Sequence, residues 1–360
     1  MDMYRKKIAW ILALFLISVL IHIYSVSPDR VESQYATGIY PYISESLRFL
    51  FGWIPVSIGD ILYGIAAVWL CWGLLSFLYR LIRGRLSING LKKGLLTALI
   101  VLLSIYIIFN IFWGINYNRK GISYQLGIDE KKFTSMQLRQ LDSILLEKVN
   151  ESKRALVKND AVKKTNKEIF DESMDAYKTI AVSYPFLTYR QQAVKHSLWG
   201  WVGNYLGFAG YYDPFTGEAQ VNTTEPSFLL PYTTCHEMAH QLGYAKEDEA
   251  NFVGYLAAAA STDTAFHYSV YLDLFLSANR NLYNVDSAEA KTLAKQLLPE
   301  VKTDLKEWRA FEIKHKNPVE PAIRWLYGKY LENNKQPSGL LTYDEVTGLL
   351  IQYYNKFGKM

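Results

Sequence analysis

The chain has 360 residues, half of them hydrophobic and 15% aromatic, and its formal net charge is +5. This modest charge occurs in short clusters beside apolar runs, which argues against a nucleic-acid-binding protein, because such a protein needs a basic face. Two cysteines, Cys71 and Cys235, are too few for a disulfide framework in the polar second half of the chain.

Three apolar runs in the first third are each close to the ~20 residues that a helix needs to cross a bilayer. They cover about residues 8–24, 58–79 and 95–117. The first run could be a signal peptide, but it lacks a good small-residue cleavage site and two further runs follow it. We therefore predict three membrane-spanning helices in a domain of residues 1–117.

The loop between the second and third runs carries basic residues and no acidic ones: Arg80, Arg83, Arg85, Lys92 and Lys93. By the positive-inside rule, this loop and the N-terminus face the cytoplasm, so residues 118–360 form an extracytoplasmic domain. The aromatic stretch at residues 40–55 either lies in the membrane interface or folds against the spans.

The second half is predicted to be mainly helical. Thr134 and Gln137 have the spacing of a capping box in front of a long amphipathic helix. Further helices are expected at about 169–184, 264–282, 287–314, 320–333 and 344–357. Turn signals around residues 205–212 and 217–222 predict two short strands or a hairpin. The expected fold is therefore mainly α with a small β-sheet.

The stretch TTCHEMAHQLGYAKEDEANF, residues 233–252, contains the most specific pattern. His236 and His240 stand four residues apart, so on a helix both imidazoles share one face and can bind one Zn²⁺. Glu237 projects beside that face, where it can take a proton from a metal-bound water. The alternative is an ordinary helix whose histidines only pack, although chance matches are rare in a chain with six histidines.

A third ligand is expected from the next helix, because Gly243 ends the first one and KEDEANF follows at once. Its carboxylates are Glu247, Asp248 and Glu249. In gluzincin-type peptidases the glutamate ligand is followed four residues later by an Asp or Asn that hydrogen-bonds a zinc histidine. Glu247 and Asn251 resemble that pair, which favours Glu247 over Glu249, with Asp248 behind.

Two features depart from known patterns. The distance in sequence from His240 to Glu247 is shorter than in thermolysin-like enzymes. The stretch also resembles the longer metzincin motif, but Lys246 stands where that motif has its third histidine. Lysine is a poor zinc ligand, so the metzincin pattern is incomplete.

The segments GYYDPFTGEAQVN and LLPYTTCHEMAHQLGYAKEDEANFVGYLA, with three spans ending in WGINYNR, resemble a family of uncharacterised membrane proteins typical of Bacteroidota. The resemblance covers nearly the whole chain. It implies a bacterial cytoplasmic (inner) membrane protein with a zincin-like α+β metallopeptidase domain, and it leaves the substrate open.

The expected function is that of a membrane-anchored zinc metallopeptidase acting on peptides or proteins of the cell envelope. His236, His240 and Glu247 would bind Zn²⁺, Glu237 would act as general base and then as proton donor, and Asn251 would orient a histidine. The alternative is a non-catalytic scaffold or receptor with a structural zinc site. A signalling peptidase lacks a cytoplasmic effector here, and an intramembrane site conflicts with the polar sequence around the motif.

Several smaller expectations remain open. The strand at residues 217–222 either pairs with an extended substrate or belongs to a plain core hairpin. The donor to an oxyanion could be Tyr211, Tyr212, His267 or Tyr343. Cys235 is expected to be a small buried apolar residue rather than a ligand.

Overall fold

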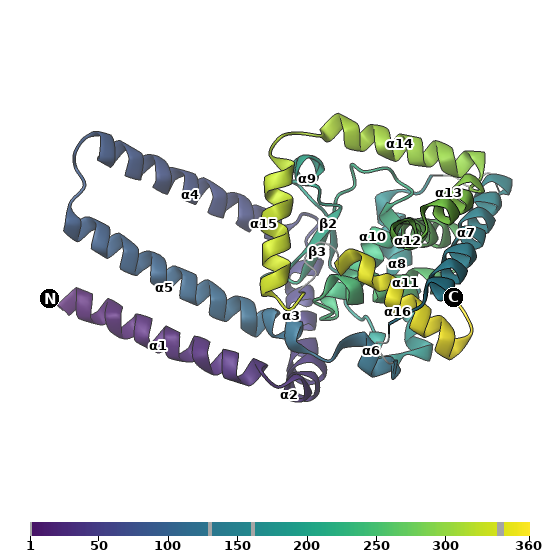
Figure 1. Cartoon of the computed structure of the whole chain (residues 1–360). Coiled ribbons are helices and arrows are strands. Elements are labelled where there is room, and N and C mark those ends of the chain that lie inside the picture. The colour runs from purple at the N-terminus through teal and green to yellow at the C-terminus, as the bar shows by residue number, and fades with distance from the viewer. Residues whose placement is uncertain (1, 129–131, 160–162, 337–341) are drawn as a thin grey trace.

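The computed structural model describes residues 2–128, 132–159, 163–336 and 342–360. Three of its helices are long and apolar enough to cross a membrane: α1 (Asp2–Ser25), α4 (Ile58–Ile82) and α5 (Ile88–Phe112). α1 and α5 run side by side, while α4 stands apart from them (Figure 1). The N-terminus and the α4–α5 turn lie at the ends farthest from the globular part, so all three helices enter that part from one side.

The third apolar run ends earlier than the predicted residue 117. α5 stops at Phe112, and a 3₁₀ turn, η2 (Gly114–Asn118), follows. Trp113 and Tyr117 are buried in a cluster with Tyr35 and Tyr212 instead of lying in the membrane. Hydropathy cannot separate these aromatic residues from the end of a span, because aromatic residues are also common at membrane interfaces.

The stretch after α1 is folded and packs on the globular half. It contains α2 (Pro28–Arg30), a π-helix η1 (Val31–Ile39) and α3 (Tyr40–Gly52). Tyr40 Oη and Ser44 Oγ donate to the Gln241 carbonyl, over 3.1 and 2.7 Å. A buried ion pair joins Glu32 to Arg119 over 3.0 Å. This stretch is therefore folded between the apolar helices and the second half, since Tyr35 Oη also donates to the Ile111 carbonyl of α5 over 2.9 Å. Phe49, Leu50 and Trp53 of residues 40–55 stay exposed, so a position in the membrane interface remains a prediction.

Helices make up most of the globular part. α7 (Ser135–Lys158) begins with the predicted capping box, since Gln137 N donates to Thr134 Oγ1 and Thr134 N donates to Gln137 Oε1. It packs with α8 (Asn166–Ser183), α10 (Leu230–Gln241), α11 (Glu247–Ala260), α12 (Thr264–Val285) and α16 (Thr342–Phe357) around one apolar core. α10 and α11 lie inside this core, which holds them rigidly.

Further elements complete the globular part: α6 (Gly121–Leu126), η3 (Pro185–Leu187), α9 (Gly200–Leu206), α13 (Ser287–Lys295), α14 (Pro299–His315) and α15 (Glu320–Asn333). The helix predicted at 287–314 is divided into α13 and α14. Pro299 opens the second of them, which is a position that proline favours.

A three-stranded sheet lies beside α10, with β1 (Val194–His196), β2 (Gly210–Asp213) and β3 (Glu218–Val221) in the order β1-β3-β2. β2 and β3 form the predicted antiparallel hairpin, and β1 pairs with β3 in parallel. β3 is central, so the strand expected at 217–222 belongs to a core hairpin and is not free to pair with a substrate. β2 is an edge strand of the described sheet.

Candidate metal centre

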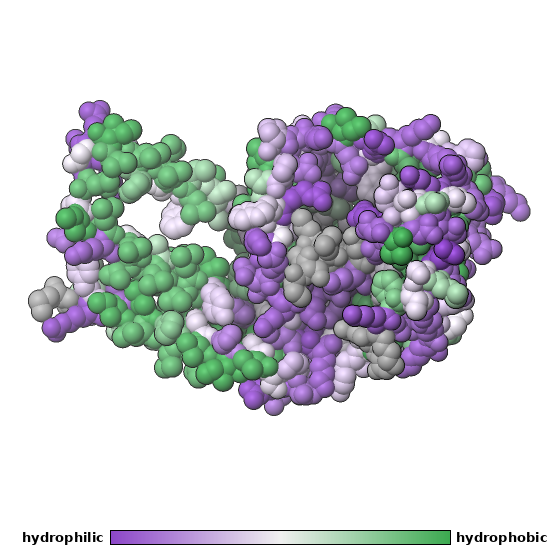
Figure 2. Space-filling view, viewed as in Figure 1, coloured by the Kyte–Doolittle hydropathy of each residue, from purple (hydrophilic) through white to green (hydrophobic). Residues whose placement is uncertain are grey.

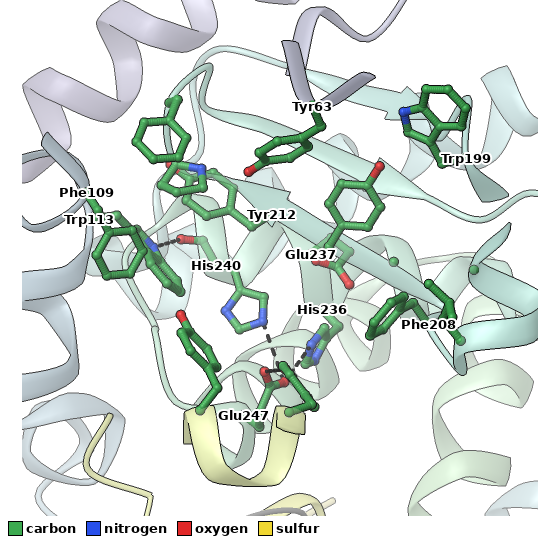
Figure 3. A pocket seen from close by; sticks show the side chains of 18 of the residues that line it. Tyr63, Phe109, Trp113, Trp199, Phe208, Tyr212, His236, Glu237, His240 and Glu247 are labelled. Atoms are coloured by element: carbon green, nitrogen blue, oxygen red, sulfur yellow. Dashed lines mark hydrogen bonds and ion pairs between the residues drawn. The ribbon is translucent and has the colours of Figure 1, made fainter. Parts of the chain in front are cut away.

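Two histidines of α10 and one glutamate of α11 converge on a single point. The rings of His236 and His240 lie 4.7 Å apart, centroid to centroid, and nearly perpendicular to each other. Their Nε2 atoms lie 3.3 and 3.6 Å from Glu247 Oε2. The three side chains can each offer one ligand atom, and these atoms lie within 4.8 Å of one another (Figure 3).

The convergence depends on how tightly α11 approaches α10. Gly243 adopts φ +87°, which reverses the chain after α10. Further along α11, a Cβ added at Gly254 would lie only 3.0 Å from the backbone nitrogen of His236. A glycine allows this close crossing without moving the α10 backbone, and the crossing brings the start of α11, with Glu247, next to the histidines.

Neighbouring groups orient two of the three side chains. His240 Nδ1 donates to the Tyr244 carbonyl over 2.7 Å, which leaves the Nε2 lone pair free for a ligand. Tyr327 Oη donates to Glu247 Oε1 over 2.8 Å, and Glu247 N donates to Gln336 Oε1 over 2.9 Å. Glu247 Oε2 is buried and has no regular hydrogen bond within the described part of the chain. The contacts of a metal-binding carboxylate are thus in place.

The ionisable groups perturb one another strongly. Burial alone would raise the pKa of Glu247, but the two histidines outweigh it and hold this pKa well below its usual range. Burial alone would lower the pKa of His240, but the Glu247 carboxylate raises it to about 9. Without a cation, a proton shared with His240 balances the buried charge of Glu247. A divalent cation would do the same with two imidazoles as ligands.

Glu237 lies beside this cluster and outside it. It is 3% exposed, and its Oε2 has no hydrogen-bond partner among the residues that the structure describes. Burial raises its pKa to about 7, against the opposing effect of both histidines. Its carboxylate packs against Gly210 of β2, where an added Cβ would lie 2.6 Å from Glu237 Oε1. A carboxylate with this pKa can both accept and release a proton near neutral pH.

A cavity of about 460 Å³ opens above the cluster. His236, Glu237, His240 and Glu247 form part of its wall. The rest is largely aromatic and comes from α4, α5, α9, β2 and α15, with Tyr63, Phe109, Trp113, Trp199, Phe208, Tyr212, Tyr327 and Tyr330 among the lining residues (Figure 3). The cluster is therefore accessible to a small group or an extended chain.

The predicted third ligand is the one that reaches the histidines. Glu247 joins the cluster, whereas the carboxylate of Glu249 lies against Gly121 and pairs with Lys246 over 3.1 Å. Asp248 is also outside the cluster, and burial raises its pKa to about 7. Successive helical residues point in different directions, so only one of the three carboxylates can face α10.

The predicted hydrogen bond from Asn251 is not formed. His240 Nδ1 bonds Tyr244, and His236 Nδ1 is buried without a hydrogen-bond partner in the described residues. Asn251 lines a neighbouring cavity together with His236, so it is close but not bonded to the ring. The backbone carbonyl of Tyr244 takes the expected orienting role, at the other histidine.

The predicted oxyanion donors and Cys235 have different outcomes. Tyr211 and Tyr212 line the cavity, while His267 bonds the Ser261 carbonyl and lies outside the residues lining it. The side chain of Tyr343 lies outside the described residues. Cys235 is completely buried, as expected, and burial raises its pKa to about 12.

Sequence reasoning missed Tyr327, Gln336 and Trp113. Tyr327 follows Glu247 by 80 residues and Gln336 follows it by 89. No spacing rule connects positions so far apart. Trp113 Nε1 donates to the His240 carbonyl over 3.2 Å, which ties the end of α5 to the histidine helix.

Comparisons with known proteins place the chain in a family without assigning it an activity. No curated protein and no solved structure matches it. A family profile matches residues 35–351, which include His236, His240 and Glu247 and nearly all of the globular part. The chain therefore belongs to the family described as "Protein of unknown function (DUF3810)".

Proposed function

We propose that this protein is a membrane-anchored zinc metallopeptidase with a zincin-like catalytic domain. The observation that carries the proposal is the convergence of His236, His240 and Glu247 in an accessible cavity that also contains Glu237. Two imidazoles and one carboxylate are a ligand set typical of catalytic zinc, which keeps a fourth position open. A structural zinc site is closed and has no use for a further buried carboxylate.

The residues present fit such an ion. The three ligand atoms are already close together, and two of the side chains are oriented by Tyr244 and Tyr327. When bound, zinc would lower the pKa of a coordinated water and polarise the carbonyl of a peptide bond.

Glu237 would supply the proton transfers. Its pKa of about 7 suits a group that takes a proton from water and later gives it to the leaving amine. Gly210 and β2 hold the carboxylate from one side, and the histidine helix holds it from the other. Glu237 is not one of the three clustered ligands, so it is free for this role.

β2 would bind the substrate backbone. It is an edge strand of the described sheet, and Gly210, Tyr211 and Tyr212 line the cavity. An extended peptide can add to such an edge through main-chain hydrogen bonds. This role passes to β2 from the central strand β3, whose two edges are already paired.

We further infer that the catalytic domain lies outside the cytoplasm of a bacterial cell. The basic α4–α5 loop and the N-terminus lie at the ends of the apolar helices remote from the globular part. Fusion of alkaline phosphatase, which is active only outside the cytoplasm, after Met360 tests this orientation. An active fusion supports it, and an inactive fusion that is well expressed contradicts it.

The Glu237→Gln variant tests catalysis. The substitution keeps the shape of the side chain and removes its ability to take a proton. We expect the purified variant to bind zinc like the wild type, while peptides produced in wild-type cell envelopes disappear from cells that contain only the variant. Identical envelope peptides, with zinc bound in both proteins, would instead indicate a scaffold with a structural metal.

A further inference from the structure

The metal cavity is bounded in part by the apolar helices. Tyr63 belongs to α4 and Phe109 to α5, and both line the same cavity as the metal cluster. Tyr63 lies five residues after the start of α4, and Phe109 three residues before the end of α5. At 1.5 Å per residue, the cavity wall extends only about 5–8 Å along these helices. The cavity therefore lies where the globular part meets the apolar helices.

The direction of α4 is fixed at this point. The Glu218 carboxylate accepts hydrogen bonds from Ile58 N and Gly59 N, over 3.2 and 2.7 Å. Leu198 N donates to Asp60 Oδ2 over 2.6 Å. These contacts tie the first turn of α4 to the sheet. These contacts at the start of α4 therefore fix the direction in which it leaves the globular part, apart from α5.

An open gap separates the two helices beyond the start of α4. Figure 2 shows apolar surface on α4 and on the α1–α5 pair, with a gap between them. No residue in the most apolar stretch of α4 is buried by the rest of the described chain. Within a bilayer, this gap opens sideways toward the lipid.

An apolar groove runs along α4 on the side where Trp199 packs. Its volume is about 590 Å³, and its lining includes Ile65, Val68, Trp69 and Trp72 of α4 together with Trp199. Trp199 also lines the metal cavity, so the two spaces meet at this side chain. It packs closely on α4, where a Cβ added at Gly64 would lie 2.9 Å from Trp199 Cζ2.

We propose that the substrates are polypeptides held in the bilayer by an apolar segment, which lie along α4 and reach the metal centre sideways past Trp199. The segment would lie along the α4 groove. This inference rests on the proposed peptidase function and names its substrate class. An apolar groove facing lipid gains little from a soluble peptide, whereas it can pack against an apolar membrane segment.

The edge strand β2 sets the form of the substrate at the cut. Gly210, Tyr211 and Tyr212 of β2 line the metal cavity. A strand edge pairs with an extended chain through main-chain hydrogen bonds. The cleaved stretch would therefore enter as an extended chain beside β2, while a helical anchor stays outside in the groove.

Two probes in proteoliposomes containing the full chain test the proposal. Both carry the same randomised ten-residue stretch, and one of them continues into a leucine-alanine helix long enough to span the bilayer. We expect the anchored probe to be cleaved at least tenfold faster than the soluble one. Equal cleavage of both probes would overturn the proposal, whereas cleavage of neither would count against the peptidase function itself.

A matched pair of variants tests the groove. Ile65 on α4 and Leu16 on α1 are 61% and 59% exposed. The loss of apolar contact should make Ile65→Gln cleave the anchored probe about tenfold more slowly, while Leu16→Gln stays at the wild-type rate. Equal effects of the two substitutions would contradict binding along α4.

Cross-linking supplies a readout without turnover. An anchored probe with a photoreactive diazirine in its apolar helix is added to the Glu237→Gln protein, and the cross-linked residues are identified by mass spectrometry. Cross-links at residues 61–72 support the groove, even if no probe is cleaved. Cross-links confined to α1 and the outer face of α5 would refute lateral access, whatever the cleavage rates.

Discussion

The hydrogen bond from Tyr327 to Glu247 gives the sharpest test of how the proposed metal centre is held. Tyr327 Oη donates to Glu247 Oε1 over 2.8 Å, and both side chains line the cavity. A hydrogen bond to a charged acceptor contributes about 1.5–3 kcal/mol. At about 1.4 kcal/mol per decade, Tyr327→Phe should weaken zinc binding roughly 10–100-fold, which is the range typical of groups that orient a metal ligand.

Competition with a chromophoric zinc chelator measures this affinity in the purified protein. Tyr330→Phe is the control, because its ring stacks on Tyr327 at 6.0 Å but its hydroxyl bonds Tyr117 over 3.1 Å. We expect the control to keep its affinity within about twofold, since it removes only a neutral hydrogen bond to Tyr117 and none to the three ligands. Unchanged zinc affinity in Tyr327→Phe would refute the assignment of Glu247 as an oriented ligand.

Two further substitutions test neighbouring claims. Gly210→Ala places a Cβ 2.6 Å from Glu237 Oε1 and 2.8 Å from the Gln220 carbonyl oxygen of β3, so it should displace this carboxylate and the edge strand and lower kcat by about 100-fold with zinc content unchanged. Gly73→Ala, whose Cβ meets nothing within 4 Å, is its control, and a wild-type kcat in Gly210→Ala would contradict the placement of the base. Burial raises the pKa of Asp142 to about 7, above its value in the unfolded chain. The protonated side chain therefore adds to the free energy of unfolding at low pH, and this contribution is lost as the pH rises through 7. The Asp142→Asn variant has no proton to lose, and its side-chain oxygen can still accept the hydrogen bond from Asn279. Urea unfolding should show that its free energy of unfolding falls by about 2 kcal/mol less than that of the wild type between pH 5 and pH 7. Identical pH profiles of the two proteins would count against the burial of Asp142.

The histidine pair was predictable because its information is local. A spacing of four residues fixes the common face of His236 and His240 on any helix. For the third ligand, the sequence could rank Glu247 above Glu249 but could not decide between them. The choice between them depends on the angle at which α11 leaves Gly243 and on the close crossing at Gly254.

Contacts between distant segments were not predictable. β3 becomes a central strand because β1, only three residues long, pairs with it from upstream. So short a strand has no detectable alternation in sequence. Trp113 looked like the end of a span, although it is buried against the histidine helix. The contribution of α4 and α5 to the wall of the cavity was also missed, because hydropathy does not give the positions of helices in space.

Metal analysis of the purified chain tests the central claim most directly. The wild-type protein should contain about one zinc ion per chain, and Glu247→Ala should lose it, because two imidazoles alone bind the ion weakly. Glu249→Ala is the matched control on the same helix, and it should keep its zinc, since its carboxylate faces Gly121 and Lys246. A wild-type protein without bound metal, or equal zinc contents in the two variants, would contradict the account.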